Sequence, residues 1–115
     1  MKNIMILLLV AIFGFTTQAQ EIKNKNAKYT FEVKGNCNQC QRRIQKAAFS
    51  VSGVKMANWD IDSHQMSLIL NEEKASLLQV KQAIAKVGHD TDEVKATDND
   101  YDHLHFCCHY ERVKE

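Results

Sequence analysis

Four cysteines carry the most reactive chemistry in this sequence, and two of them, Cys37 and Cys40, stand three positions apart. Residues 29–33 before them alternate between apolar and polar side chains, as a strand with one buried face does, and a helical period follows Cys40. Unpaired N–H groups at the start of a helix favour the thiolate, which binds soft metals and exchanges disulfides. The spacing alone also occurs in redox proteins, in half of a zinc site and in ordinary disulfides.

The other two cysteines lie in a short C-terminal stretch with five potential metal ligands: His103, His105, Cys107, Cys108 and His109. A disulfide between the adjacent cysteines is disfavoured, because neighbouring Cα atoms lie about 3.8 Å apart and disulfides usually span roughly 4.4–6.8 Å. An extended backbone would place His103, His105, Cys107 and His109 on one face, whereas a helix would group His105, Cys108 and His109.

Four interpretations of this stretch remain open. It forms a second metal site of its own, or it donates Cys107 or Cys108 to a site shared with Cys37 and Cys40. Alternatively, it binds metal only adventitiously, or it forms a loop-to-tail disulfide in an oxidising compartment.

The N-terminus has the pattern of a secretory signal peptide. Lys2 precedes an apolar run over residues 4–15, and the small residues Thr17 and Ala19 precede a cut that we expect between Ala19 and Gln20. The run is too short to cross a bilayer comfortably as a permanent helix. We therefore expect an exported protein, periplasmic or extracellular, with no stable membrane insertion after cleavage.

Composition limits the partners of the exported chain. Removing residues 1–19 takes away Lys2 and no acidic residue, which brings the formal net charge from +1 to zero. Such a balance favours neither nucleic acid nor an anionic membrane as a partner. The remaining residues are enough for one small domain, and four cysteines in an exported protein would ordinarily suggest two disulfides.

The order of elements is that of a small α+β domain over residues 28–96, preceded by a flexible polar leader over residues 20–27 and followed by a Cys/His-rich tail over residues 97–115. Apolar periodicity predicts strands over residues 29–33, 54–61 and 66–70, helices over residues 38–51 and 77–87, and a weaker final strand over residues 89–96. The sequence therefore predicts a ferredoxin-like βαββαβ fold, with one antiparallel sheet and both helices on one face.

The helix boundaries carry their own signals. Asn38 followed by Gln41 resembles a capping arrangement for the first helix, and Ser76 followed by Gln79 matches a capping box for the second. Gly88 is a natural stop for the second helix, as Gly53 is for the first.

Residues 33–40, Gly53 with Val54, the hairpin and residues 83–88 resemble the heavy-metal-associated domain, from residue 28 to about residue 94. These small ferredoxin-like modules occur in copper chaperones and at the N-termini of metal-pumping ATPases. The resemblance implies that Cys37 and Cys40 bind a soft ion, most commonly Cu(I), and pass it by ligand exchange to a partner such as a metal-transporting ATPase.

Two positions depart from the family pattern. Asn36 stands where the family usually has a methionine that packs against the metal loop. His89 follows Gly88, where the family more often has an aromatic residue or a lysine. His89 is therefore either a third ligand or an ordinary surface histidine at the end of the second helix.

We expect a binding protein and not an enzyme: a carrier or a sequestering buffer for Cu(I), with Zn(II), Hg(II) and Ag(I) as other ions that accept thiolates. One alternative is a thiol-disulfide oxidoreductase, with Cys37 as the nucleophile and Cys40 as the resolving thiol. Thioredoxin-like enzymes place a cis-proline against the motif, and this sequence contains no proline. The other alternative is a structural domain stapled by disulfides.

Overall fold

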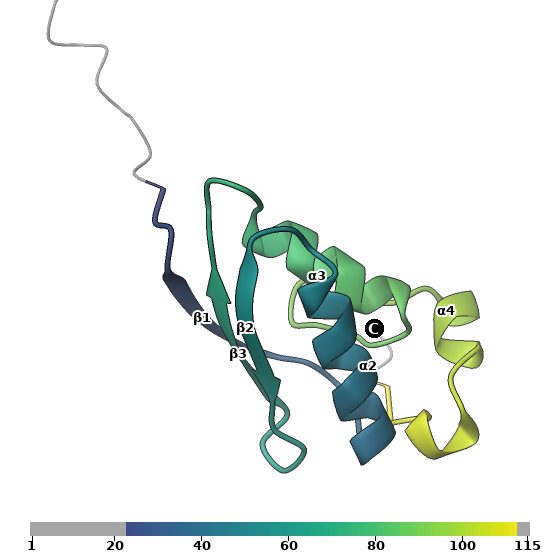
Figure 1. Cartoon of the computed structure of the whole chain (residues 1–115). Helices are drawn as coiled ribbons and strands as arrows, with labels where there is room; N and C mark the ends of the chain where they lie inside the picture. Colours follow the sequence, from purple (N-terminus) through teal and green to yellow (C-terminus); the bar gives the residue numbers. More distant parts are fainter. Residues whose placement is uncertain (1–22, 113–115) are drawn as a thin grey trace, which may run out of the picture.

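The structure is a computed structural model that describes residues 23–112, so the signal peptide expected over residues 1–19 lies outside the described residues. The elements in order are β1 (Ala27–Glu32), α2 (Asn38–Phe49), β2 (Val54–Trp59), β3 (Gln65–Leu70), α3 (Leu77–Lys86), α4 (Asp98–Asp102) and the 3-10 turn η1 (Phe106–Cys108). Figure 1 shows the strands as one layer and α2 and α3 as a second layer on one face of the sheet. The ferredoxin-like α+β fold predicted from the sequence is confirmed.

The sheet is antiparallel, and its strand order is β1-β3-β2. Met66 at the start of β3 lies opposite Phe31 on β1 and Trp59 on β2, and all three side chains are buried. The alternation predicted from the sequence therefore places one set of side chains on the helix-covered face. The predicted hairpin between β2 and β3 is also confirmed, and its turn contains His64 with a positive φ of 61°.

The helices bury the apolar stripes that their periodicity predicts. Ile44 and Ala48 of α2 and Val80 and Ile84 of α3 are buried in the same core as the inner face of the sheet. Trp59 is completely buried, and its indole N–H donates to the carbonyl of Val33 at 3.0 Å. The core thus extends up to the loop between β1 and α2, where the first cysteine pair lies.

The predicted final strand over residues 89–96 is reduced to a single antiparallel bridge between Thr91 and Val33. Side chains in this segment hydrogen-bond to nearby backbone groups and so compete with strand pairing. The Thr91 hydroxyl accepts the Val94 N–H at 2.9 Å, and the Asp90 carboxylate accepts the Ala96 N–H at 2.7 Å. The segment consequently curls into a turn after one bridge, at the free edge of β1.

The tail, expected to begin with a polar spacer, contains two short helical segments, α4 and η1, and lies beyond the layer of helices (Figure 1). Leu104, Cys108 and Tyr110 are buried, although the residues between them are exposed. These three side chains join the core of the domain. The described part of the tail is therefore packed against the fold.

The start of the described chain is likewise attached to the domain. Strand β1 begins at Ala27, one residue before the predicted domain boundary, and Asn24 exchanges hydrogen bonds with Glu72 after β3: its N–H donates to the Glu72 carboxylate at 3.0 Å and its carbonyl accepts the Glu72 N–H at 2.9 Å. In residues 23–112 we find no helix with the length and apolar character needed to cross a membrane.

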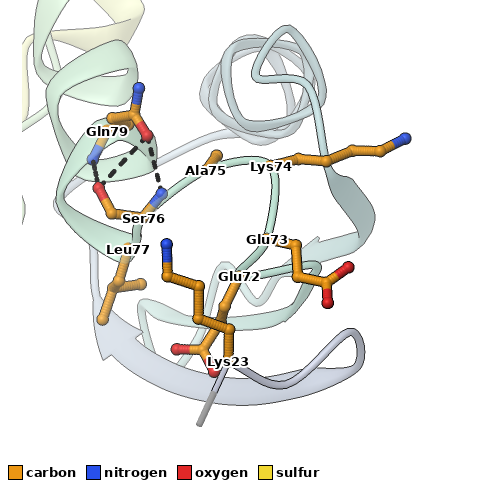
Figure 2. Close-up of a pocket in the computed structure, with 8 residues that line it drawn as sticks. All are labelled: Lys23, Glu72, Glu73, Lys74, Ala75, Ser76, Leu77 and Gln79. Carbon is orange, nitrogen blue, oxygen red and sulfur yellow. Dashed lines mark hydrogen bonds between the residues drawn. The ribbon is translucent and has the colours of Figure 1, made fainter. Parts of the chain in front are cut away.

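The capping box predicted for the second helix is confirmed at the start of α3 (Figure 2). The Ser76 hydroxyl accepts the Gln79 N–H at 3.3 Å, and the Gln79 side chain accepts the Ser76 N–H at 2.8 Å. A surface hollow surrounds this helix end, and its lining consists of Lys23, Glu72, Glu73, Lys74, Ala75, Ser76, Leu77 and Gln79. Because these residues include no cysteine or histidine, the hollow offers no soft metal ligand from the described residues.

Candidate metal site

The first cysteine pair lies where β1 leads through a short loop into α2. Cys37 is the N-cap residue, and its carbonyl accepts the Gln41 N–H at 3.0 Å as the first hydrogen bond of the helix. The expected capping by Asn38 is wrong, because Asn38 is already the first residue of the helix and the Gln41 side chain donates to the carbonyl of Trp59 instead. Consequently the Cys37 sulfur stands at the helix N-terminus, where a capping side chain would be.

Gly35 allows the loop to pass close to the core. A Cβ atom at this position would lie 3.0 Å from Trp59 and 3.1 Å from the Cβ of Cys40. Any larger residue would therefore push against a buried indole ring or against one of the two cysteines. The absence of a side chain at Gly35 therefore allows the loop to lie against the core.

Three sulfur atoms converge at this helix start. The Sγ of Cys37 lies 3.4 Å from that of Cys40 and 3.1 Å from that of Cys108, which comes from the tail. All three sulfurs lie within 4.8 Å of one another. Cys40 and Cys108 are completely buried, and Cys37 is partly exposed. The site is therefore a largely dry group of thiols with one accessible member.

The surroundings give Cys37 and Cys40 very different pKa values. Burial opposes ionisation of Cys37, but the thiol of Cys108 and the N–H groups of Cys40 and Gln39 outweigh it and lower the pKa of Cys37 to about 7. Burial raises the pKa of the Cys40 thiol to about 12. One thiolate is thus available near neutral pH, and Cys40 loses its proton only when a metal or another electrophile replaces it.

Asn36, the first departure from the family pattern, contacts the site through its side chain. It is exposed, and its amide oxygen accepts a hydrogen bond from the Cys40 thiol at 3.3 Å. A methionine could pack in this loop but could accept only a weak hydrogen bond. The Asn36 side chain therefore gives the buried Cys40 thiol a hydrogen-bond acceptor, while the raised pKa of that cysteine comes from burial.

His89, the second departure, is completely buried, so it is not the surface histidine of one sequence interpretation. Its Nδ1 lies 2.7 Å from the carbonyl oxygen of Lys34, which requires the proton on Nδ1. Burial, together with the charge of Arg43, lowers the pKa of His89 to about 4, so the ring is neutral. The Nε2 atom is buried and has no hydrogen-bond partner among the described residues. His89 is not part of the group of three sulfurs.

The other tail residues do not gather around one point. His103 contacts the carbonyl oxygen of Asn99 in its own helix at 2.6 Å, and His109 stacks on Tyr101. His105 is exposed, and so is Cys107, whose thiol donates to the Gln39 side chain at 3.3 Å. In the part of the chain that the structure describes, Cys37, Cys40 and Cys108 are the one group of three or more Cys, His, Asp or Glu ligand atoms this close together. Among the described residues, the tail therefore brings the Cys108 sulfur beside Cys37 and Cys40, and its other potential ligands do not form such a group.

Two tail residues that the sequence analysis did not single out fix the position of Cys108. The buried Tyr110 hydroxyl donates to the carbonyl of Gly88 at 2.8 Å and accepts the Asp90 N–H at 2.9 Å. Arg112 binds both oxygens of the buried Asp90 carboxylate, each at 3.0 Å. We call Tyr110 and Arg112 the tail clasp. Neither residue belongs to a periodic apolar pattern. The only sequence signal in this segment is its high density of potential metal ligands.

Comparisons by sequence and by structure relate this chain to the same group of proteins. No family model matches the sequence. The chain is 31% identical over 55 residues to the copper chaperone CopZ of Staphylococcus haemolyticus. The aligned residues make up 48% of this chain and 81% of that protein. The structure is also similar to a CopZ metallochaperone, with a TM-score of 0.55 and 26% identity over 56% of this chain and 98% of the other.

Two further solved structures share the fold. The N-terminal domain of a potential copper-translocating P-type ATPase from Bacillus subtilis, solved in the Cu(I)-loaded state, gives a TM-score of 0.55 and 27% identity over 57% of this chain and 84% of that domain. Oxidized MerP from Ralstonia metallidurans gives a TM-score of 0.56 and 24% identity over 58% of this chain and 96% of its own, which is a likeness of fold alone. With the match to the Staphylococcus chaperone and the thiol pair at the start of α2, these similarities lead to one conclusion: the chain belongs to the family of copper-chaperone-like heavy-metal-associated domains.

Proposed function

We propose that this protein binds Cu(I) through Cys37 and Cys40 and serves as an exported carrier or sequestering buffer for that ion. Thiolate sulfur is a soft ligand that favours Cu(I) over hard ions such as Mg²⁺. The relatives support the choice of metal, since one is named a copper chaperone and another is a domain in a Cu(I)-loaded state. Zn(II), Hg(II) and Ag(I) are the competing ions at such a site.

The observation that carries this proposal is the convergence of thiols at the N-terminus of α2. Cys37 is partly exposed and has a pKa of about 7, so an arriving ion meets a thiolate at the surface. Cys40, 3.4 Å away, is buried and yields its proton as the ion binds. An accessible thiolate beside a buried thiol suits uptake and release by ligand exchange, and no catalytic cycle is needed.

Export and partner are part of the same proposal. The pattern of residues 1–19 supports secretion to the periplasm or the extracellular space. An exported Cu(I) protein needs a donor or an acceptor, and a metal-transporting ATPase is the partner class that similarity to an ATPase domain supports.

The test is an anaerobic Cu(I) titration of the reduced chain, residues 20–115, against a competing chelator. Cys37→Ser and Cys40→Ser should each weaken Cu(I) binding strongly, because each removes one soft ligand. The matched control is Cys107→Ser, which removes an exposed thiol outside the group of three and should bind as the unaltered chain does. Unchanged affinity in both the Cys37 and the Cys40 variant would refute the proposal.

Thiol-disulfide exchange is the second candidate function, and the lowered pKa of Cys37 favours it. A disulfide-reductase assay on the same metal-free chain separates the two. We expect no turnover above that of a small-molecule thiol. Turnover that requires Cys37, combined with weak Cu(I) binding, would replace the metal function by the redox one.

A further inference from the structure

We propose that Cys108 is a third metal ligand, so that the tail closes a three-sulfur site over the Cys37 and Cys40 pair. This inference rests on the proposed metal function and specifies its ligand set. It concerns a cysteine far along the chain, 71 positions after Cys37, whose sulfur nevertheless lies 3.1 Å from that of Cys37.

The spacing of the sulfurs favours three ligands over two. With metal–sulfur bonds of about 2.3 Å, two thiolates on opposite sides of an ion lie roughly 4.6 Å apart, whereas three in a plane lie about 4.0 Å apart. The Sγ atoms of Cys37 and Cys40 are 3.4 Å apart, and all three sulfurs are within 4.8 Å of one another. Side-chain shifts of less than about 1 Å would therefore produce a trigonal site.

The position of Cys108 is fixed by the fold around it. Its N–H donates to the carbonyl of His105 at 2.8 Å, and its side chain is completely buried in the domain core. The tail clasp follows within four residues, and the Tyr110 carbonyl accepts a further hydrogen bond from the Tyr101 hydroxyl at 2.6 Å. A ligand held in this way loses little conformational entropy when it binds an ion, which distinguishes it from an adventitious tail ligand.

The N-terminus of α2 offsets part of the charge of such a site. Three thiolates with one Cu(I) carry a net charge of −2, and the N-terminus of α2 contributes a partial positive charge beside Cys37. Binding releases the remaining thiol protons to solvent, and no electron is transferred.

Cys107 provides a matched control for Cys108. It is the adjacent cysteine in the same segment, but it is exposed, and its sulfur lies 3.9 Å from that of Cys108 and outside the group of three. Replacing either residue by serine removes one thiol from the tail. Only the change at Cys108 should alter the metal site.

The experiment is Cu K-edge X-ray absorption on the reduced chain, residues 20–115, loaded with one equivalent of Cu(I), together with competition titrations. We expect three sulfur neighbours per copper in the unaltered chain and in Cys107→Ser, and two in Cys108→Ser. Loss of the third ligand should weaken Cu(I) binding by at least about tenfold, since even outer-shell partners of metal ligands account for 10- to 100-fold.

The possible outcomes distinguish a failure of the three-sulfur site from a failure of the proposed Cu(I)-binding function. Two sulfur neighbours in the unaltered chain would overturn the three-sulfur site and leave the proposed function of Cys37 and Cys40 in place. Because this spectrum is measured on the unaltered chain, it does not depend on the folding of any variant. Equal affinity of Cys108→Ser and Cys107→Ser would have the same meaning. Failure of the unaltered chain to bind Cu(I) tightly would instead remove the proposed function itself.

Discussion

Replacing Tyr110 by Phe tests how firmly the tail is attached to the domain. The substitution keeps the buried ring and removes only the hydroxyl, which bridges the carbonyl of Gly88 at 2.8 Å and the N–H of Asp90 at 2.9 Å. Both backbone groups would then be buried without these partners. Each unsatisfied group costs about 1–3 kcal/mol, so the free energy of unfolding should fall by about 2–6 kcal/mol.

The assay is urea unfolding of the reduced, metal-free chain, followed by the fluorescence of its single tryptophan, Trp59. The slope of the free energy against urea should stay the same, because the surface exposed on unfolding hardly changes. Tyr29→Phe is the matched control, since its hydroxyl donates to the Glu72 carboxylate at the surface, and we expect it to cost only about 1 kcal/mol. A cost for Tyr110→Phe no larger than that of Tyr29→Phe would show that the hydroxyl does not anchor the tail.

Three further predictions concern reactivity, packing and processing. Alkylation of Cys37 should rise through a midpoint near pH 7, because the thiolate is the reactive form. Cys108→Ala should move that midpoint upward, because it removes the hydrogen bond that lowers the pKa of Cys37. A midpoint above about pH 8.5 in the unaltered chain would contradict this. Gly88→Ala should lower the free energy of unfolding in urea by more than about 2 kcal/mol. The reason is that φ is 102° at Gly88 and a Cβ there would lie 2.8 Å from the carbonyl oxygen of Asp100. A decrease of less than about 1 kcal/mol would be inconsistent with that contact. The protein recovered from its own cell envelope should begin at Gln20 by N-terminal sequencing, and an intact Met1 would argue against the signal peptide.

The elements with a clear period were predictable from sequence, because periodicity reports which side chains face a core. The alternation in β1, β2 and β3 and the apolar stripes of α2 and α3 gave the right fold class and the right loop for Cys37 and Cys40. The final strand was the exception, since its outcome depends on hydrogen bonds from Asp90 and Thr91 that compete with strand pairing.

The ligand set was less predictable than the fold, because it depends on contacts between distant parts of the chain. Sequence patterns left open whether Cys107 or Cys108 would join Cys37 and Cys40, or whether the tail would form a site of its own. The choice of Cys108 follows from the tail clasp, in which Tyr110 meets the end of α3 and Arg112 meets Asp90. His89 shows the same limit, since its burial against the Lys34 carbonyl is a tertiary contact that no local pattern reports.

The central claim, that the group of three sulfurs holds the metal, is tested most directly by replacing Cys37, Cys40 and Cys108 together with serine. This variant retains Cys107 and all five histidines of the chain. Native mass spectrometry of the reduced protein, residues 20–115, with one equivalent of Cu(I) and a competing chelator should show one bound copper in the unaltered chain and none in the variant. One copper retained by the variant under the same competition would place the site elsewhere and contradict the account.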